Sequence, residues 1–234
     1  MDDILKNADR AEELASTFAT RISRLEAQVT EREEALLAEA ERFRKTSPHI
    51  DASAREVVRA QARQHVQRET RASRRNLREA TDKERVERLK ELMEMDATVA
   101  KLEPLHASPV QMLSRVGLGS PERTNYQAQL RHAGPRELEN HAKWAVAQGD
   151  KILAAAVLSR LDAMPTKSRP LNTREFAEKL VGEEFERLQS AFRRTRLAVQ
   201  RAINADRAFE NGRITGASRI ALGLAARLSE SAAR

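Results

Sequence analysis

The chain contains no cysteine and few aromatic residues, and each absence restricts what it does. Without cysteine it has no disulfide bonds, no thiolate metal ligands and no cysteine nucleophile. Aromatic residues make up 3% of the chain, with one Trp and one Tyr, whereas a large globular core is normally built with more of them. We therefore expect thin, elongated packing over part of the chain, and no bound cofactor or metal.

Long apolar runs are missing as well. No stretch approaches the roughly 18 uninterrupted apolar residues of a membrane-spanning helix. The first residues include two acids, Asp2 and Asp3, and no apolar segment, which is unlike a secretory signal. The sequence therefore predicts a soluble, cytoplasmic protein without a membrane span.

Charge, by contrast, is abundant and unevenly distributed. Charged residues make up 33% of the chain, and glycine (8) and proline (7) are few, which is typical of long helices and coiled coils. The net charge is +7. Residues 1–103 are close to neutral, whereas residues 187–234 carry ten arginines against three acids. Such a basic C-terminal segment predicts an anionic partner.

The clearest pattern is a heptad repeat over residues 2–46, where ten of twelve seam positions are apolar. Steps of four and three residues held over more than five heptads are typical of a coiled-coil seam. The same alternation of four and three residues recurs in the last long helix that the sequence predicts, residues 171–211. We expect these seams to pair helices within a chain or between the chains of a homo-oligomer. The large seam side chains are Ile4, Phe18, Ile22, Leu25, Val29, Leu36, Phe43, Val181, Phe185, Leu188, Phe192 and Val199.

Pro48 interrupts the first helix, and a second helix is predicted from about residue 53 to 102. Folding the chain back at position 49 brings the acidic residues 31–41 near the arginines of residues 55–68. The sequence therefore predicts an antiparallel coiled-coil hairpin about 65 Å long, at roughly 1.5 Å per residue. One continuous helix kinked at Pro48 is the alternative.

Beyond residue 103 frequent Pro and Gly residues predict short helices, including a helical hairpin over residues 135–163. We expect Trp144 and Tyr126 to anchor its core. The predicted fold is therefore all-α, in three parts: a coiled-coil hairpin (1–103), a short-helix bundle (104–170) and a long basic helix followed by a terminal helix (171–234).

No residue pattern predicts catalysis. Glu137 and His141 lie four apart and could supply two metal ligands, but di-iron bundles use a spacing of three, so we predict a helical ion pair. The segment Gly117–Ser120 resembles a glycine-rich phosphate loop. It lacks the GKS/T signature and a preceding strand, so it predicts a turn and a helix N-cap. A helical enzyme would need a polar pocket within residues 104–165, for which few candidates exist, and we expect no enzyme.

Two arginine clusters are the candidate sites for an anionic partner. Residues 55–78 hold eight arginines against two acids. The fold-back sets the last four of them mainly opposite Glu26, Arg24 and Arg21, so we expect these four to remain unpaired. The other cluster lies in residues 193–227. Few aromatic residues are free to stack on bases, so binding to nucleic acid would be independent of sequence. The candidate residues are Arg71, Arg74, Arg75, Arg78, Arg193, Arg194, Arg196 and Arg201.

This layout, a coiled-coil arm followed by a small helical module and a basic C-terminal helix, resembles helical bacteriophage virion and assembly proteins, such as scaffolding or internal head and tail proteins. The resemblance implies a structural role inside a larger assembly, in the cytoplasm or in a virion formed there. We therefore predict an oligomeric, non-enzymatic assembly protein that binds other proteins. The alternative is a nucleic-acid-binding protein of the nucleoid or partition type.

Overall fold

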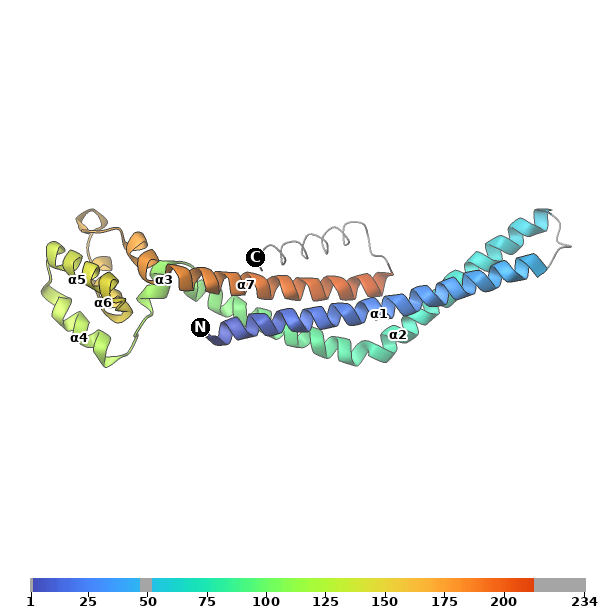
Figure 1. Ribbon diagram of the computed structural model, residues 1–234, viewed down its shortest axis with the longest axis horizontal. Coiled ribbons are helices and arrows are strands. Elements are labelled where there is room, and N and C mark those ends of the chain that lie inside the picture. Colours follow the sequence, from blue (N-terminus) through green and yellow to red (C-terminus); the bar gives the residue numbers. More distant parts are fainter. Residues whose placement is uncertain (1, 47–51, 213–234) are drawn as a thin grey trace. The chain divides into compact units, whose positions relative to one another are not determined.

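The computed structural model describes residues 2–46 and 52–212, and over these residues every regular element is a helix (Figure 1). The predicted all-α fold is confirmed. The terminal helix expected at about residues 215–232 lies outside the described residues. The long helices are α1 (Asp2–Thr46), α2 (Ala52–Leu102) and α7 (Thr173–Asn211), and the short ones are α3 (Pro109–Ser114), α4 (Pro121–Gln129), α5 (Pro135–Gln148) and α6 (Lys151–Asp162).

The described residues form two compact units. The first, here called the short-helix unit, comprises residues 2–8 and 97–193. The second, the long-helix unit, comprises residues 9–96 and 194–212. All three long helices contribute residues to both units. The packing groups therefore differ from the three consecutive parts that composition suggested, because each half of α7 packs with a different set of helices.

In the long-helix unit α1 and α2 run antiparallel, and the second half of α7 packs against them. The ion pairs Arg10–Glu91 and Arg21–Glu84 join α1 to α2 close to the register that the fold-back predicts. The core is built of alanines and larger apolar residues spaced three and four apart, which places them on one face of each helix. Its buried members are Ala11, Ala15, Phe18, Ile22, Leu25, Val29, Leu92, Ala198, Val199, Ala202, Ala205 and Phe209.

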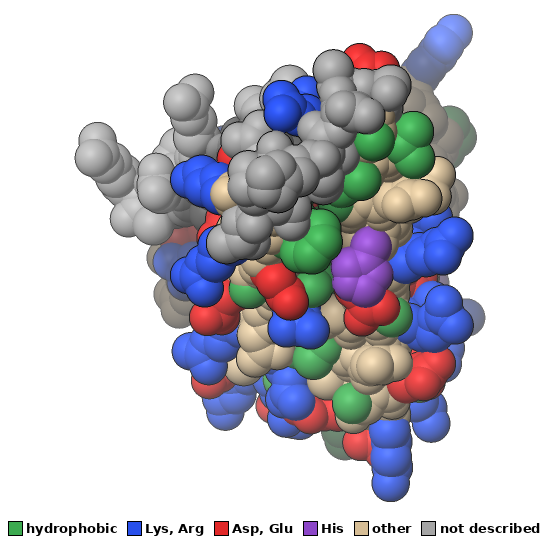
Figure 2. Space-filling model, turned by 90° about the vertical axis from the view of Figure 1, so that its right-hand side faces the viewer, with side chains coloured by type: hydrophobic (Ala, Val, Ile, Leu, Met, Phe, Trp, Pro, Cys, Tyr) green, Lys and Arg blue, Asp and Glu red, His purple; other side chains and the backbone are tan. Residues whose placement is uncertain are grey.

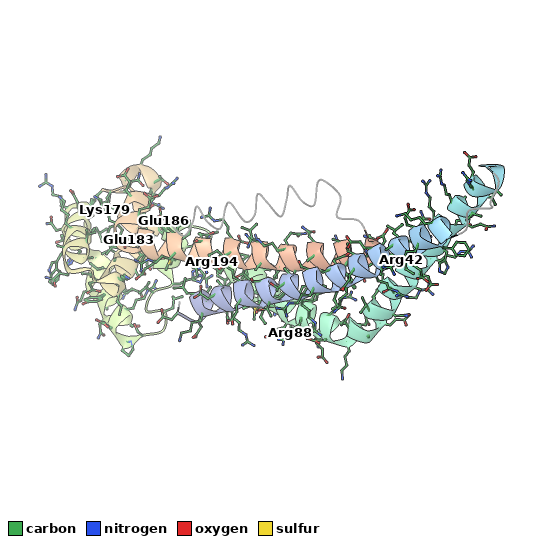
Figure 3. The ribbon with its side chains drawn as sticks, turned by 45° about the vertical axis from the view of Figure 1, so that its right-hand side comes forward. Arg42, Arg88, Lys179, Glu183, Glu186 and Arg194 are labelled. Atoms are coloured by element: carbon green, nitrogen blue, oxygen red, sulfur yellow. The ribbon has the colours of Figure 1, made fainter. Side chains whose placement is uncertain are left out.

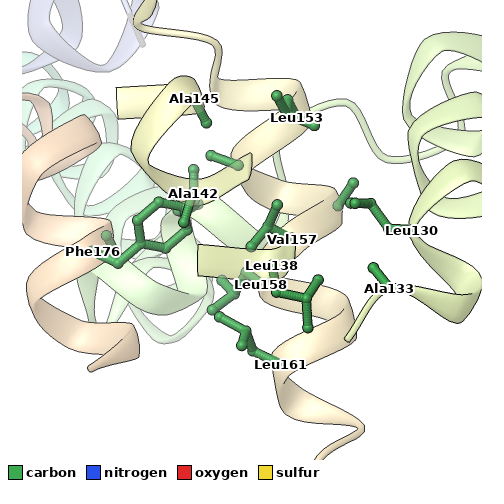
Figure 4. Packing of buried hydrophobic residues seen from close by; sticks show 14 of the residues in the cluster. Leu130, Ala133, Leu138, Ala142, Ala145, Leu153, Val157, Leu158, Leu161 and Phe176 are labelled. Carbon is green, nitrogen blue, oxygen red and sulfur yellow. The ribbon is translucent and has the colours of Figure 1, made fainter. Parts of the chain in front are cut away.

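In the short-helix unit α6 is the central element. Six consecutive residues of α6, Leu153 to Leu158, are buried, because α3, α4 and α5 surround it. Figure 4 shows Val157, Leu158 and Leu161 of α6 among side chains of the neighbouring elements. Phe176 from the start of α7 packs into the same core.

The short helices begin and end where the sequence predicts. Ser108 and Ser120 accept hydrogen bonds from backbone N–H groups at the starts of α3 and α4, and Asp150 does so for α6. Gly149 ends α5 with a φ of 67°, a left-handed conformation that favours glycine. Glu137 accepts a hydrogen bond from the N–H of Gly134 at 2.8 Å, so the expected pairing with His141 is replaced by a capping interaction.

Trp144 is not the core anchor that the sequence predicts, because its exposed fraction is 55%. The buried face of α5 consists of Leu138, Ala142 and Ala145, and Trp144 lies on a different side of this helix. The two alanines allow α6 to approach closely, which leaves no room for an indole ring on that face. Tyr126 is half-buried, and its hydroxyl donates to Asp150 at 3.1 Å.

Candidate interaction surfaces

The most strongly buried charged pair of the long-helix unit joins Arg85 of α2 to Asp206 of α7. Arg85 Nε donates to Asp206 Oδ1 at 2.7 Å, and the exposed fractions of the two side chains are 3% and 12%. Burial alone would lower the pKa of Arg85, but the hydrogen bond and the charge of Asp206, aided by Glu210, outweigh it and raise the pKa. Arg85 therefore stays charged inside the bundle.

Around this pair, Arg74 and Arg78 of α2 are also held by acids. Arg74 pairs with Glu26 of α1 and donates to the backbone oxygen of Phe209 at 2.8 Å. Arg78 pairs with Glu210 at 2.7 Å. The fully buried ring of Phe209 has the guanidinium groups of Arg74 and Arg85 at 5.7 and 5.5 Å from its centre, within the range of cation–π attraction. The contacts of Arg74, Arg78 and Arg85 with α7 hold the end of this helix against the α1–α2 hairpin.

Arg194 of α7 is held in the same manner by α1. It donates to Asp9 at 2.6 Å and to both carboxylate oxygens of Glu12, at 2.7 and 3.0 Å (Figure 3). The hydrogen bond that Arg194 donates to Glu12 raises the pKa of Arg194 above its usual value, against the opposing effect of partial burial. Asp9 and Glu12, two of the acids that keep residues 1–103 close to neutral, thus pair with an arginine of α7.

The eight predicted anion-binding arginines consequently divide into two groups. Arg74, Arg78 and Arg194 make internal ion pairs, so the expectation that the first two remain unpaired is wrong. Arg78 is paired because α7 brings Glu210 beside α2, whereas the partner of Arg74 is Glu26 of α1, within the hairpin itself. Of the other five, Arg71, Arg75, Arg193 and Arg196 are exposed and Arg201 is half-buried, and Arg196 and Arg201 also make contacts within the chain.

An outward basic face remains on α2. Arg68, Arg71 and Arg75 are exposed, and their spacing of three and four places them on one side of the helix. Within the described part of the chain these three arginines make no ion pair. This face could bind phosphates or an acidic protein surface.

The free end of the hairpin carries a cleft of about 740 Å³ between α1 and α2. Leu36 and Val66 form part of its floor and are buried, whereas Leu37 and Phe43 are 49% and 61% exposed. Figure 2 views the molecule from the side of the α1–α2 connection and shows hydrophobic side chains among charged ones of both signs. Among the described seam residues that the sequence predicts, Phe43 is the only one that is mostly exposed.

The other predicted seam residues lie on packed faces. Those of α1 from Phe18 to Leu36 are buried, and Ile4 is half-buried. In α7, Phe185 is half-buried, while Val181, Leu188 and Phe192 are buried in the short-helix unit and Val199 in the long-helix unit. The heptad pattern therefore marks the sides of these helices that contact other helices of the same chain.

The short-helix unit contains one charged residue that sequence reasoning missed. Arg123 is 5% exposed and donates to the backbone oxygens of Ser114 and Val116, at 2.7 and 2.8 Å, and to the hydroxyl of Ser159 at 2.9 Å. These bonds tie the loop after α3 to α6. Burial lowers the pKa of Arg123. Because its acceptors are backbone groups, no charge pattern in the sequence points to it.

The sequence does contain a signal for the buried pair. Asp206 and Thr195 are the two polar residues at seam positions of α7, and both are buried. A charged residue on an otherwise apolar stripe needs a partner of opposite charge. That partner, Arg85, is one of many arginines and could not be singled out from α2 alone.

Two further searches of the described residues gave negative results. They contain no group of three or more His, Asp or Glu side chains placed to hold a metal ion. None of the described helices is long and apolar enough to cross a membrane.

Comparisons of the chain with protein-family models, with curated proteins and with solved structures each gave no match. Function is therefore argued from the chain's own surfaces.

Proposed function

We propose that the protein is a non-enzymatic structural protein that forms part of a larger oligomeric assembly and binds its partners through helical surfaces. The observation that carries this proposal is the open end of the α1–α2 hairpin. There a cleft of about 740 Å³ with exposed Leu37 and Phe43 has no third helix over it among the described residues. Unfilled apolar clefts between helices are suited to receive a further helix.

The end of α7 explains why this cleft is open. The last buried residue of α7, Phe209, lies against Arg74 of α2, and the helix ends two residues later, at Asn211. Between Arg74 and the hairpin connection, α2 continues for more than five turns without α7. The layout resembles that of bacteriophage virion proteins, which makes a virion or its assembly intermediate one setting for this role.

A second function is favoured by a separate observation, the outward basic face of α2. Arg68, Arg71 and Arg75 are exposed and make no ion pair with described residues. Three guanidinium groups on one helix face fit the phosphates of a nucleic acid, bound without regard to sequence. This function would not use the apolar cleft.

Light scattering of the full chain, with and without duplex DNA, separates the two functions. The assembly proposal predicts a mass well above the 26.3 kDa of one chain, rising with protein concentration and unchanged by DNA. A mass of one chain at every concentration would contradict it.

Nucleic-acid binding instead predicts a DNA complex that weakens as salt rises. Replacing Arg68, Arg71 and Arg75 with alanine should then reduce the slope of log affinity against log salt by about 1 per arginine. A matched control removes three exposed basic residues of the short-helix unit, Arg131, Arg136 and Lys167, and should leave that slope unchanged.

A further inference from the structure

The charges at the free end of the hairpin differ from those along its middle. In the middle, bases on one helix pair with acids on the other, as in Arg10–Glu91 and Arg74–Glu26. Toward the free end, residues 31–41 of α1 carry five acids against one base, Arg32, and residues 55–68 of α2 carry four arginines against one acid, Glu56. Glu33 and Glu39, on α1, and Arg59 and Arg63, on α2, make no ion pair with described residues.

These charges flank the apolar cleft. Glu39 contributes to its α1 side, and Glu33 lies one turn before Leu37 on the same helix face. Arg59 and Arg63, which are also one turn apart, contribute to the α2 side. The rest of the charged rim consists of Glu41, Lys45, Arg55 and His65. The cleft thus has an apolar floor with mainly acidic residues along α1 and basic residues along α2.

We propose that the occupant of this cleft is the hairpin end of a second copy of the chain. In a two-fold arrangement the α1 of each copy faces the α2 of the other, so that acids meet bases on both sides of the shared apolar floor. The four helices then form a closed bundle that covers Leu37 and Phe43. This inference rests on the proposed function and identifies both the partner and the surface of the oligomer.

Other occupants fit the same surface less well. Residues 213–234 carry four arginines against one acid, Glu230, so a helix formed from them would place bases against Arg59 and Arg63. A nucleic acid would meet the acids on α1 and would leave the apolar floor uncovered. A second copy alone supplies acidic, basic and apolar surfaces in matching positions.

Charge reversal on the full-length protein tests the inference. One variant carries Glu33→Arg and Glu39→Arg, and the other carries Arg59→Glu and Arg63→Glu. Each variant alone places like charges opposite each other, so its dimer dissociation constant should rise about tenfold or more. Mixing the two variants one to one restores opposite charges on both sides and should restore the dimer mass in light scattering.

Matched controls reverse exposed charges elsewhere in the long-helix unit. Glu79→Arg with Glu87→Arg, and Arg24→Glu with Arg207→Glu, change the net charge equally at residues that make no ion pair with described residues. Both controls should dimerise like the wild type. Circular dichroism of all variants checks that helix content is kept.

Three results would overturn the inference in distinguishable ways. If the wild type forms an oligomer that the hairpin-end reversals leave unchanged, the partner surface is wrong while the assembly function stands. A wild type that remains a single chain at all concentrations contradicts both the inference and the proposed function. A mixture that stays monomeric while each control dimerises contradicts the two-fold pairing.

Discussion

At the scale of single residues, Asp206 shows how a charge is accommodated in a narrow helical bundle. It occupies a seam position of α7, where its carboxylate is withdrawn from water, and Arg85 supplies the compensating charge at 2.7 Å. Burying such a pair gains little compared with an apolar pair of similar volume. Its effect is to fix how α7 is placed along α2, since only one register joins the two groups.

Replacing Asp206 with alanine should therefore lower the free energy of unfolding by about 3 kcal/mol, because the buried guanidinium of Arg85 loses its hydrogen-bonded partner and keeps only the longer pair with Glu210, at 3.4 Å. Urea unfolding followed by circular dichroism measures this change. The double replacement Arg85→Met with Asp206→Leu removes both charges and should recover most of the loss.

A control for this prediction is Lys90→Ala, which removes an exposed i,i+4 pair with Glu94 on the same helix. That change should cost less than about 0.5 kcal/mol. If Asp206→Ala costs no more than Lys90→Ala, the buried pair does not stabilise the bundle as argued.

At the scale of elements, the helix ends of the short-helix unit are determined by local chemistry. The connection between α5 and α6 is only two residues long: Gly149 takes the left-handed conformation, and Asp150 caps the next helix through N–H groups of Ile152 and Leu153. The tight turn sets α5 antiparallel and close to α6, so that Ala142 and Ala145 are buried. This local control is the reason that sequence reasoning located these elements.

Gly149→Ala should lower the free energy of unfolding by about 1–2 kcal/mol, since a Cβ disfavours the left-handed conformation. No side chain lies within 4 Å of the added carbon, so the cost comes from the backbone alone. Thermal unfolding measures it. Gly134→Ala is the control: its φ is −78° and its surroundings are also empty, so its backbone accepts a Cβ without strain. The weaker N-capping by alanine is offset by the lower conformational entropy of the unfolded chain, which leaves a net cost under about 0.5 kcal/mol. Equal losses in the two variants would refute the backbone explanation.

At the scale of the whole molecule, the proposed dimer makes stability depend on protein concentration. Association stabilises the folded state by mass action, so the melting temperature should rise by about 1–2 °C for each tenfold increase in concentration. Scanning calorimetry over a wide concentration range measures the shift. The Arg59→Glu, Arg63→Glu variant should lose most of this dependence, and a wild-type melting temperature that is independent of concentration would argue against the dimer.

Much of the fold could be predicted from the sequence, for identifiable reasons. The heptad of α1 and the Pro and Gly residues that separate the short helices are local signals, readable from neighbouring residues. The side that each helix buries follows from the same periodicity, since Phe18 to Leu36 are buried as a stripe. The prediction that Trp144 anchors the core fails because the burial of a helical residue follows its position around the helix and not its size.

The candidate sites were less predictable, because they depend on which helices meet. The sequence by itself determined that the described chain is helical, where its short helices begin and end, and which helix faces are apolar. Only the tertiary structure decided which arginines are used internally: α7 brings Asp206 and Glu210 to Arg85 and Arg78, which lie more than a hundred residues away along the chain. It also decided that α7 does not cover the cleft beside Phe43, because this helix ends at Asn211, shortly after its contact with Arg74. Periodicity is a property of neighbouring residues, whereas charge pairing and the covering of a cleft depend on segments that only folding brings together.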